Sequence, residues 1–352
     1  MTRARTIQTS SLLLGIAALA TSAQAADWPQ FGYDGTHSGY NAAETTISAA
    51  NVSQLATAYP AAIALPANVD SAPVYARAVG TPGGTRNLLF AFGSSSLFDG
   101  GSSTGTLMAI DADTGALVWS KTSSGSSQHA SASPAVDPAR QFVYSFGLDG
   151  YVHKYAIGSG DETLTPGPAG WPQQVTLKPD AEKVASGLTI ATVGGTSYLE
   201  VVTNGYDGDG GDYQGHLVAI NLSSGAHTVF NFMCSDGATL LANGGCSNGR
   251  ESGAWGRGGA TFDAATGGIY VASGNGNFNA NSGGHNWGDS VLAFAADGSG
   301  AGSGLPADSY TPTNYQQLDD QDIDLGSISL AILPVPAGST VLHLGMQTGK
   351  DA

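Results

Sequence analysis

Acidic side chains gather in two short stretches of this chain. The members are Asp207, Asp209 and Asp212 in the first stretch, and Asp319, Asp320, Asp322 and Asp324 in the second. Carboxylate oxygens are ligands of hard cations such as Ca²⁺, and paired carboxylates also act as acid and base in glycoside hydrolysis. The first stretch lacks the distal glutamate of an EF-hand loop, and the second also suits an acidic turn in solvent. Both stretches are therefore candidates for cation binding or acid–base chemistry.

The chain has two cysteines, Cys234 and Cys246, with eleven residues between them. In an oxidising compartment such a pair forms a disulfide, which contributes up to ~3 kcal/mol in the chain-entropy model. No pair of histidines lies beside the cysteines, which argues against a zinc site. We therefore expect a Cys234–Cys246 disulfide.

Composition and motifs exclude several classes of protein. The 352 residues include 51 glycines, and only 11% are charged, which excludes a coiled coil or helix bundle. Hydrophobic residues make up 41%, enough for a sizeable core rather than disorder. Lys and Arg total 12 against 28 Asp and Glu, so nucleic acid and anionic membranes are poor partners. The sequence also lacks an HExxH zinc motif, a nucleophile elbow and a phosphate-binding loop.

The first 25 residues have the pattern of a cleavable export signal. Arg3 and Arg5 give a positive start, Leu12–Ala20 is an apolar stretch of nine residues, and Ala23–Ala25 is a cleavage site. Nine residues are too few to span a bilayer, which needs about 20. We expect a mature start near Ala26, no transmembrane segment, and a periplasmic or secreted protein.

A repeat organises residues 26–352. Four segments begin and end with glycine and hold a short alternating strand; they are Gly105–Gly115, Gly150–Gly160, Gly215–Gly225 and Gly288–Gly298. The strands predicted before them are Leu88–Phe92, Phe142–Phe146, Leu199–Thr203 and Ile269–Ser273. The closing glycine suits a turn that needs a positive φ. Such spacing predicts an all-β fold, a β-propeller of four-stranded blades in a single domain.

Four repeats do not fill the seven or eight blades of a closed ring. A last strand is predicted over Thr340–Met346, and the chain ends at Ala352, where the next repeat would begin. The sequence therefore predicts an incomplete ring and a C-terminally truncated propeller.

Several motifs resemble those of a known family. They are Asp27–Gly32 (DWPQFG), Thr36–Asn41 (THSGYN), Asn51–Leu55 (NVSQL), and Ala109–Gly115 (AIDADTG) with Trp119. Together they resemble the mature start and the propeller repeat of the pyrroloquinoline quinone (PQQ) dependent alcohol dehydrogenases and their PQQ-like propeller relatives. The resemblance extends over nearly all of residues 27–352 and implies a periplasmic quinoprotein-like propeller.

The resemblance assigns a role to five residues. Trp255, ahead of Gly267–Asn275 (GGIYVASGN), is similar to the tryptophan on which the family stacks its quinone, and Asn275 to a Ca²⁺ ligand. Asp212 lies in a glycine-rich loop where the family has a Glu ligand. Asp322, in Gln321–Asp324 (QDID), resembles the catalytic and metal-binding aspartate. Lys350 lies where the family carries a quinone-contacting Lys or Arg.

These residue types suit the implied chemistry. Ca²⁺ takes oxygen ligands and polarises a quinone carbonyl as a Lewis acid. An aspartate beside it takes the alcohol proton as hydride moves to the quinone, and an indole face supports the flat ring. The resemblance thus implies a dehydrogenase of alcohols or sugars with PQQ and Ca²⁺ as cofactors.

The sequence departs from the family at three points. It has no adjacent cysteine pair, Asp212 is shorter than the usual Glu, and the QDID stretch lacks the family's Trp. It also has no C-x-x-C-H haem motif, so an enzyme of this kind needs an external electron acceptor.

Two other functions fit the same residues. One is a non-catalytic propeller that serves as a scaffold for protein binding in the cell envelope, with Trp255 as a packed blade residue. The other is a secreted carbohydrate-binding or hydrolytic propeller that uses paired aspartates.

Overall fold

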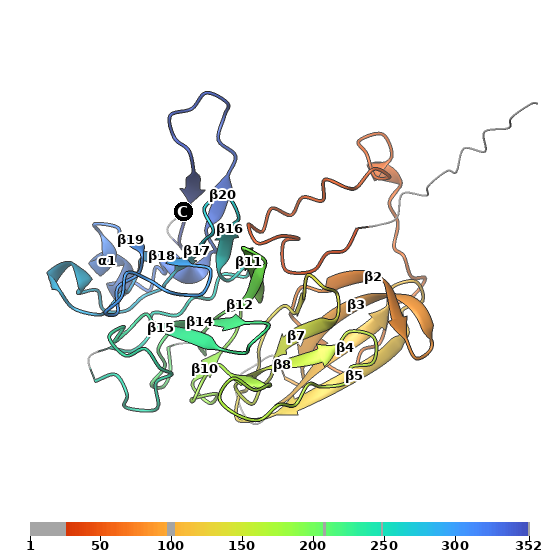
Figure 1. Cartoon of the computed structure of the whole chain (residues 1–352), viewed down its shortest axis with the longest axis horizontal. Coiled ribbons are helices and arrows are strands. Elements are labelled where there is room, and N and C mark those ends of the chain that lie inside the picture. Colours follow the sequence, from red (N-terminus) through yellow and green to blue (C-terminus); the bar gives the residue numbers. More distant parts are fainter. Residues whose placement is uncertain (1–25, 97–102, 207–208, 248, 351–352) are drawn as a thin grey trace, which may run out of the picture.

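The computed structural model describes residues 26–96, 103–206, 209–247 and 249–350 (Figure 1). The predicted export signal, residues 1–25, and Asp207 lie outside the described residues. The regular secondary structure of the described chain is almost entirely β-strand. Its helical segments are short: η1 (Val52–Gln54), η2 (Ala280–Ser282), α1 (Tyr315–Asp320) and η3 (Leu325–Ser327).

Four antiparallel sheets of the predicted kind follow one another along the chain. Blade one contains β2 (Val74–Thr81), β3 (Gly84–Ser94), β4 (Thr104–Asp111) and β5 (Leu117–Ser124), with β1 (Asn68–Val69) beside the end of β3. Blade two contains β6 (Ala135–Val136), β7 (Phe142–Phe146), β8 (Tyr151–Ala156) and β9 (Gln173–Gln174). Blade three contains β11 (Thr189–Val193), β12 (Thr196–Val202), β14 (His216–Asn221) and β15 (His227–Asn231). Blade four contains β16 (Thr261–Asp263), β17 (Gly268–Ala272), β18 (Val291–Ala295) and β19 (Asp308–Tyr310).

Two smaller pairs complete the β-structure. β10 (Glu182–Lys183) pairs with β13 (Asn204–Gly205), and β20 (Ala331–Leu333) pairs with β21 (Leu344–Met346). The strand predicted over Thr340–Met346 is thus shorter than expected, and its partner is the preceding β20. The described sheets form no closed ring, as the repeat count predicted.

The repeat identified in the sequence is the third strand of each blade. The four glycine-bounded segments contain β4, β8, β14 and β18, each paired with the strand predicted before it. The closing glycines Gly115, Gly160, Gly225 and Gly298 have φ between 71° and 76°. Because this left-handed region disfavours residues with a Cβ, glycine marks the same turn in every blade.

The hydrophobic core lies between neighbouring blades. Phe90 and Leu107 of blade one pack with Val143 and Tyr155 of blade two. Tyr144, Phe146, Leu199 and Val201 fill the space between blades two and three, and Leu217, Phe230, Ile269 and Phe294 that between blades three and four. Blades two and three bury apolar side chains on both faces, as expected where blades stack face to face.

An N-terminal strap, residues 27–37, crosses the first strands of all four blades. Its main-chain and side-chain contacts are Trp28 with Tyr75, Pro29 O with Val136 N, Gln30 Oε1 with Ile190 N, and Gly35 O with Phe262 N. Each lies between 2.7 and 2.9 Å. His37 adds contacts of its ring nitrogens with Phe31 O and Ala260 O. The strap therefore ties residues 27–37 to blades one, two, three and four in turn.

Candidate functional site

A cavity of about 300 Å³ opens where the segments leading into blades three and four meet the C-terminal segment. Its lining includes Lys183, Asn204, Tyr206, Asp209, Tyr213, Trp255, Asn275, Asp322, Asp324 and Lys350. Four of the five residues predicted for a cofactor site, Trp255, Asn275, Asp322 and Lys350, thus line one cavity, although they span almost 100 positions of the chain.

The backbone around Trp255 is anchored to η3. The N–H groups of Trp255 and Gly256 both donate to Gly326 O, at 3.1 and 2.9 Å. A Cβ on Gly256 would lie 2.5 Å from the backbone of Ile328, so this close approach requires glycine. The indole ring is half-buried, and Lys350 Nζ lies 5.3 Å from its centroid, within cation–π range. An aromatic face and an ammonium group therefore stand together in the cavity.

Lys350 joins the two aspartates of the QDID stretch. Its Nζ lies 2.6 Å from Asp324 Oδ2 and 3.0 Å from Asp322 Oδ1. Partial burial lowers the pKa of Lys350, but the hydrogen bonds to Asp324 and Asp322 outweigh that effect and raise its pKa above the ordinary value. Asp324 is 5% exposed, whereas Asp322, with a φ of 54°, is 63% exposed at the cavity rim. Asp322 is thus the carboxylate open to a ligand and solvent.

Asn275 is held through its backbone on both sides. Its N–H donates to Asp324 Oδ1 at 2.7 Å, and its carbonyl accepts from Ser252 N at 2.6 Å. The residue is buried, and its side chain lines the cavity. These bonds leave the side-chain amide to interact with a ligand, and they give Asp324 a role that the sequence analysis did not assign.

Asp212, the fifth predicted residue, does not line the cavity. Its Oδ2 accepts from Gly244 N at 2.6 Å and its Oδ1 from Gln214 Nε2 at 2.8 Å. The Gly244 hydrogen bond lowers the pKa of Asp212 below its ordinary value. Asp209 from the same glycine-rich stretch lines the cavity instead, and Tyr213 Oη donates to its Oδ1 at 2.6 Å. The chain bends between residues 209 and 213, and this bend directs Asp209 to the cavity and Asp212 away from it. The repeat pattern in the sequence does not predict the bend.

A second acid, Asp289, lies behind the cavity and is fully buried. Its Oδ1 accepts from Leu325 N at 2.9 Å, while its Oδ2 has no hydrogen-bond partner among the described residues. Burial raises the pKa of Asp289 to about 7, and the nearby Asp324 adds to the shift. Asp289 thus holds the η3 end of the QDID stretch against blade four.

The aromatic face of Trp255 suits a flat ring. For Ca²⁺, only the chemical type of the oxygen donors is suitable. Asp209, Asn275 and Asp324 offer carboxylate and amide oxygens of the kind calcium prefers. Within residues 26–350 as described, however, no three His, Cys, Asp or Glu side chains are arranged to hold a metal ion. Lys350 Nζ is the cation that Asp324 now binds. A calcium ion at this point would have to displace it.

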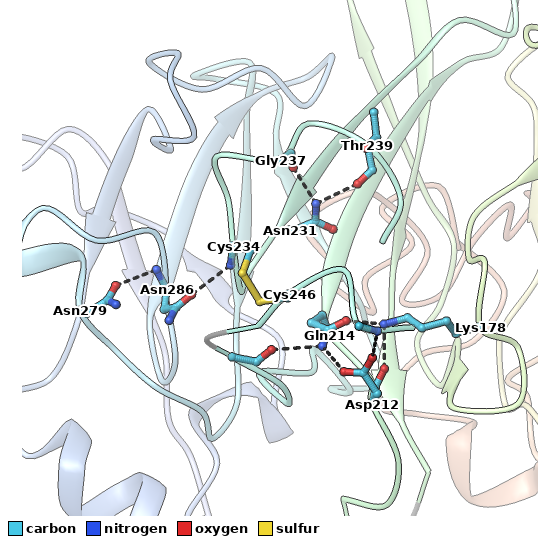
Figure 2. The surroundings of a disulfide bond; sticks show 12 residues. Lys178, Asp212, Gln214, Asn231, Cys234, Gly237, Thr239, Cys246, Asn279 and Asn286 are labelled. Atoms are coloured by element: carbon cyan, nitrogen blue, oxygen red, sulfur yellow. Dashed lines mark hydrogen bonds between the residues drawn. A yellow bond between two sulfur atoms is a disulfide. The ribbon is translucent and has the colours of Figure 1, made fainter. Parts of the chain in front are cut away.

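The predicted disulfide is present. Cys234 and Cys246 are bonded, with their Cα atoms 5.8 Å apart, in the connection between blades three and four (Figure 2). Gly244, which binds Asp212, belongs to the loop that this disulfide closes.

Comparisons with known proteins support the fold. No protein-family model and no curated protein matches the chain. The structure of quinohemoprotein alcohol dehydrogenase ADHIIG from Pseudomonas putida HK5 is similar, with a TM-score of 0.61 and 17% identity over 92% of this chain and 45% of that one. Two further structures match at low TM-scores. BamB from Moraxella catarrhalis has 0.32, with 15% identity over 69% and 61% of the two chains. An apocarotenoid oxygenase mutant from Synechocystis has 0.29, with 12% identity over 79% and 56%.

The likeness to the dehydrogenase concerns the fold alone and supports a β-propeller of four-stranded blades. The chain spans 45% of that enzyme's length. In the described part of the chain, no helix has the length and apolar character needed to cross a membrane. The disulfide is consistent with a protein outside the cytoplasm.

Proposed function

We propose that this chain forms the cofactor side of a periplasmic or secreted PQQ-dependent dehydrogenase of alcohols or sugars. The observation that carries the proposal is the meeting of Trp255, Asn275, Asp322 and Lys350 in one cavity. The family resemblance assigned these residues their roles from sequence order alone. Their joint placement is what a quinone site requires and what a packed blade residue or a solvated turn would not need.

Each residue has a defined task in this proposal. PQQ, when bound, supplies a quinone that accepts hydride from the alcohol carbon. The Trp255 indole and the Lys350 ammonium, which stand together in the cavity, would hold the quinone by stacking and by charge. Asp322, exposed at the rim, accepts the hydroxyl proton at its carboxylate. Asp324 keeps Lys350 and the Asn275 backbone in place.

In the proposal, the candidate ligands of Ca²⁺ are Asp209, Asn275, Asp322 and Asp324. Asp209 replaces Asp212 in this set because its side chain lines the cavity. We expect Ca²⁺ to bind only if Lys350 Nζ leaves Asp324 Oδ2, and PQQ offers the ammonium alternative anionic partners. Binding of PQQ and Ca²⁺ should therefore be mutually dependent.

The test is a titration of the purified chain with PQQ, with and without Ca²⁺. Retention of PQQ absorbance after gel filtration measures binding, and reduction of an artificial dye by added alcohols or sugars measures turnover. We expect Trp255→Ala to weaken PQQ binding about 10- to 100-fold, as loss of a stacking partner of roughly 1–3 kcal/mol would.

Asp322→Asn should retain PQQ but lose turnover by about 100-fold or more. Its matched control is Asp320→Asn, because Asp320 is exposed on α1 and does not line the cavity. A folded chain that fails to bind PQQ under all these conditions would refute the proposal and favour a protein-binding scaffold.

A further inference from the structure

The disulfide loop, residues 234–246, contacts Asp212, in one segment of the cavity wall, and precedes a second wall segment in the chain (Figure 2). It follows blade three and precedes Trp255 by nine residues. Cys246 is buried and Cys234 is partly exposed, so the crosslink packs against the structure on one side and faces solvent on the other.

The first wall segment, residues 209–214, binds the loop through side chains. Asp212 Oδ2 accepts from Gly244 N of the loop at 2.6 Å, and Gln214 Nε2 donates at 3.1 Å to Gly249 O, three residues after Cys246. Tyr213, which holds Asp209 in the cavity, lies between these two contact residues. The loop thus bears directly on the part of the wall that positions Asp209.

The same wall segment is fixed from its other side. Lys178 Nζ donates to Asp212 O at 2.8 Å and also bonds Gln214 Oε1 (Figure 2). Lys178 and Glu182 form a fully buried ion pair at 2.9 Å, and Glu182 Oε1 accepts from Gln214 N. Residues 212–214 are therefore clamped between a buried ion pair and the disulfide loop.

The second wall segment is the bend directly after the loop. Glu251 and Ser252 have φ of 78° and 61°, a conformation that side chains disfavour. The bend is kept in place by Glu251 N bonding Tyr213 O at 2.7 Å and by Ser252 N bonding Asn275 O at 2.6 Å. Its strained backbone leads directly into Trp255, so it needs the support of its neighbours.

We propose that the Cys234–Cys246 disulfide is a redox-sensitive brace of the cavity. Oxidised, it holds the loop, with Gly244, against Asp212. A dithiol reductant transfers two electrons and two protons, breaks the S–S bond to give two thiols, and itself becomes a disulfide. The freed loop then gains conformational freedom, and the wall that carries Asp209 and Tyr213 loosens together with the bend before Trp255.

The consequence for ligand binding rests on the proposed function, but the loosening itself does not. Backbone hydrogen exchange of the chain, oxidised and after dithiothreitol, measures the brace directly. We expect about tenfold faster exchange at residues 209–215 and 250–256 after reduction, with blade one unchanged, and a similar loss of PQQ affinity. Faster local exchange without PQQ binding would refute the proposed function and leave the brace intact.

Two variants separate the brace from general stability. Cys234→Ser with Cys246→Ser should reproduce the reduced pattern without reductant and show no further change when dithiothreitol is added. Asp212→Ala should loosen residues 209–215 while the disulfide remains formed, so the test holds even if the double variant folds poorly. Unchanged exchange at both wall segments, or a uniform rise that includes blade one, would overturn the brace.

Discussion

Blade two and the interface of blades three and four handle buried charge in opposite ways. In blade two, His153 lies between two carboxylates, with Nδ1 2.6 Å from Glu162 Oε1 and Nε2 3.1 Å from Asp149 Oδ1. In blade three, Glu200 on β12 is 1% exposed, and neither of its oxygens has a hydrogen-bond partner among the described residues. Asp289 in blade four is a milder case, with one oxygen satisfied.

The difference shows which regions of the fold contain groups that lower its stability. A buried ionisable group destabilises a protein when it has no partner, and pairing offsets much of that cost. The unpaired carboxyls both belong to the blades that build the cavity, and Asp289 lies directly behind it. In blade two, which contributes no residue to the cavity, His153 and its two carboxylates are hydrogen-bonded to one another. We therefore expect removal of charge to have opposite effects on stability in the two regions.

The largest effect is expected from Glu200→Met. Burial raises the pKa of Glu200 well above its ordinary value, and the nearby Asp297 adds to the shift. Because the folded state holds this proton more tightly, stability falls as pH rises above about 4.3. Met removes the buried carboxyl, so chemical denaturation at pH 7 should show a gain of about 1–3 kcal/mol. The control is Asp180→Met at an exposed site, where no gain is expected. A loss of stability in Glu200→Met would contradict the contrast between the regions.

Asp289→Asn should give a smaller gain of about 1–2 kcal/mol, which increases as the pH rises from about 4 to 7. Since the pKa of Asp289 is raised to about 7, its cost grows as pH rises from about 4 to 7 and is complete above that. The Asn oxygen can still accept from Leu325 N. Thermal unfolding at pH 5 and pH 8 tests this, with Asp308→Asn on the exposed edge strand β19 as control. Equal gains at both pH values would show that titration is not the cause.

His153→Asn should have the smallest effect and the opposite sign, a loss of about 0.5–1 kcal/mol at pH 6. Burial lowers the pKa of His153, but hydrogen bonds and charge from Asp149 and Glu162 prevail and raise it. A raised folded pKa means that the stabilisation is complete below about 6.5 and is lost as pH rises through the folded value. Unfolding of His153→Asn and of the exposed control His227→Asn across pH 5–9 measures this. A loss that persists unchanged at pH 9 would show packing, rather than charge, to be its source.

The sequence predicted the blades better than it predicted their contacts. Glycines with positive φ and alternating strands are local features, so the four repeats and their preceding strands were found. Trp255, Asn275, Asp322 and Lys350 were chosen from motif order, and the cavity brings them together. Asp209, Asp324 and Asp289 were not assigned to the site, because their positions depend on bends and on contacts between distant segments. Whether a carboxyl such as Glu200 finds a partner is likewise settled only by the packed structure.

The N-terminal strap has a consequence for the order in which the molecule assembles. The first residues of the strap bind blade one, but Gly35 and His37 bind residues of blade four more than 220 positions later. The strap is synthesised before the blades, but it can finish docking only after blade four has formed. Contacts this distant in the chain form slowly, because the entropy of closing a large loop is lost before the contacts can stabilise the structure. During refolding, the backbone amides of the strap should become protected from hydrogen exchange later than those of the four blades. The blades should already be stacked when the strap docks.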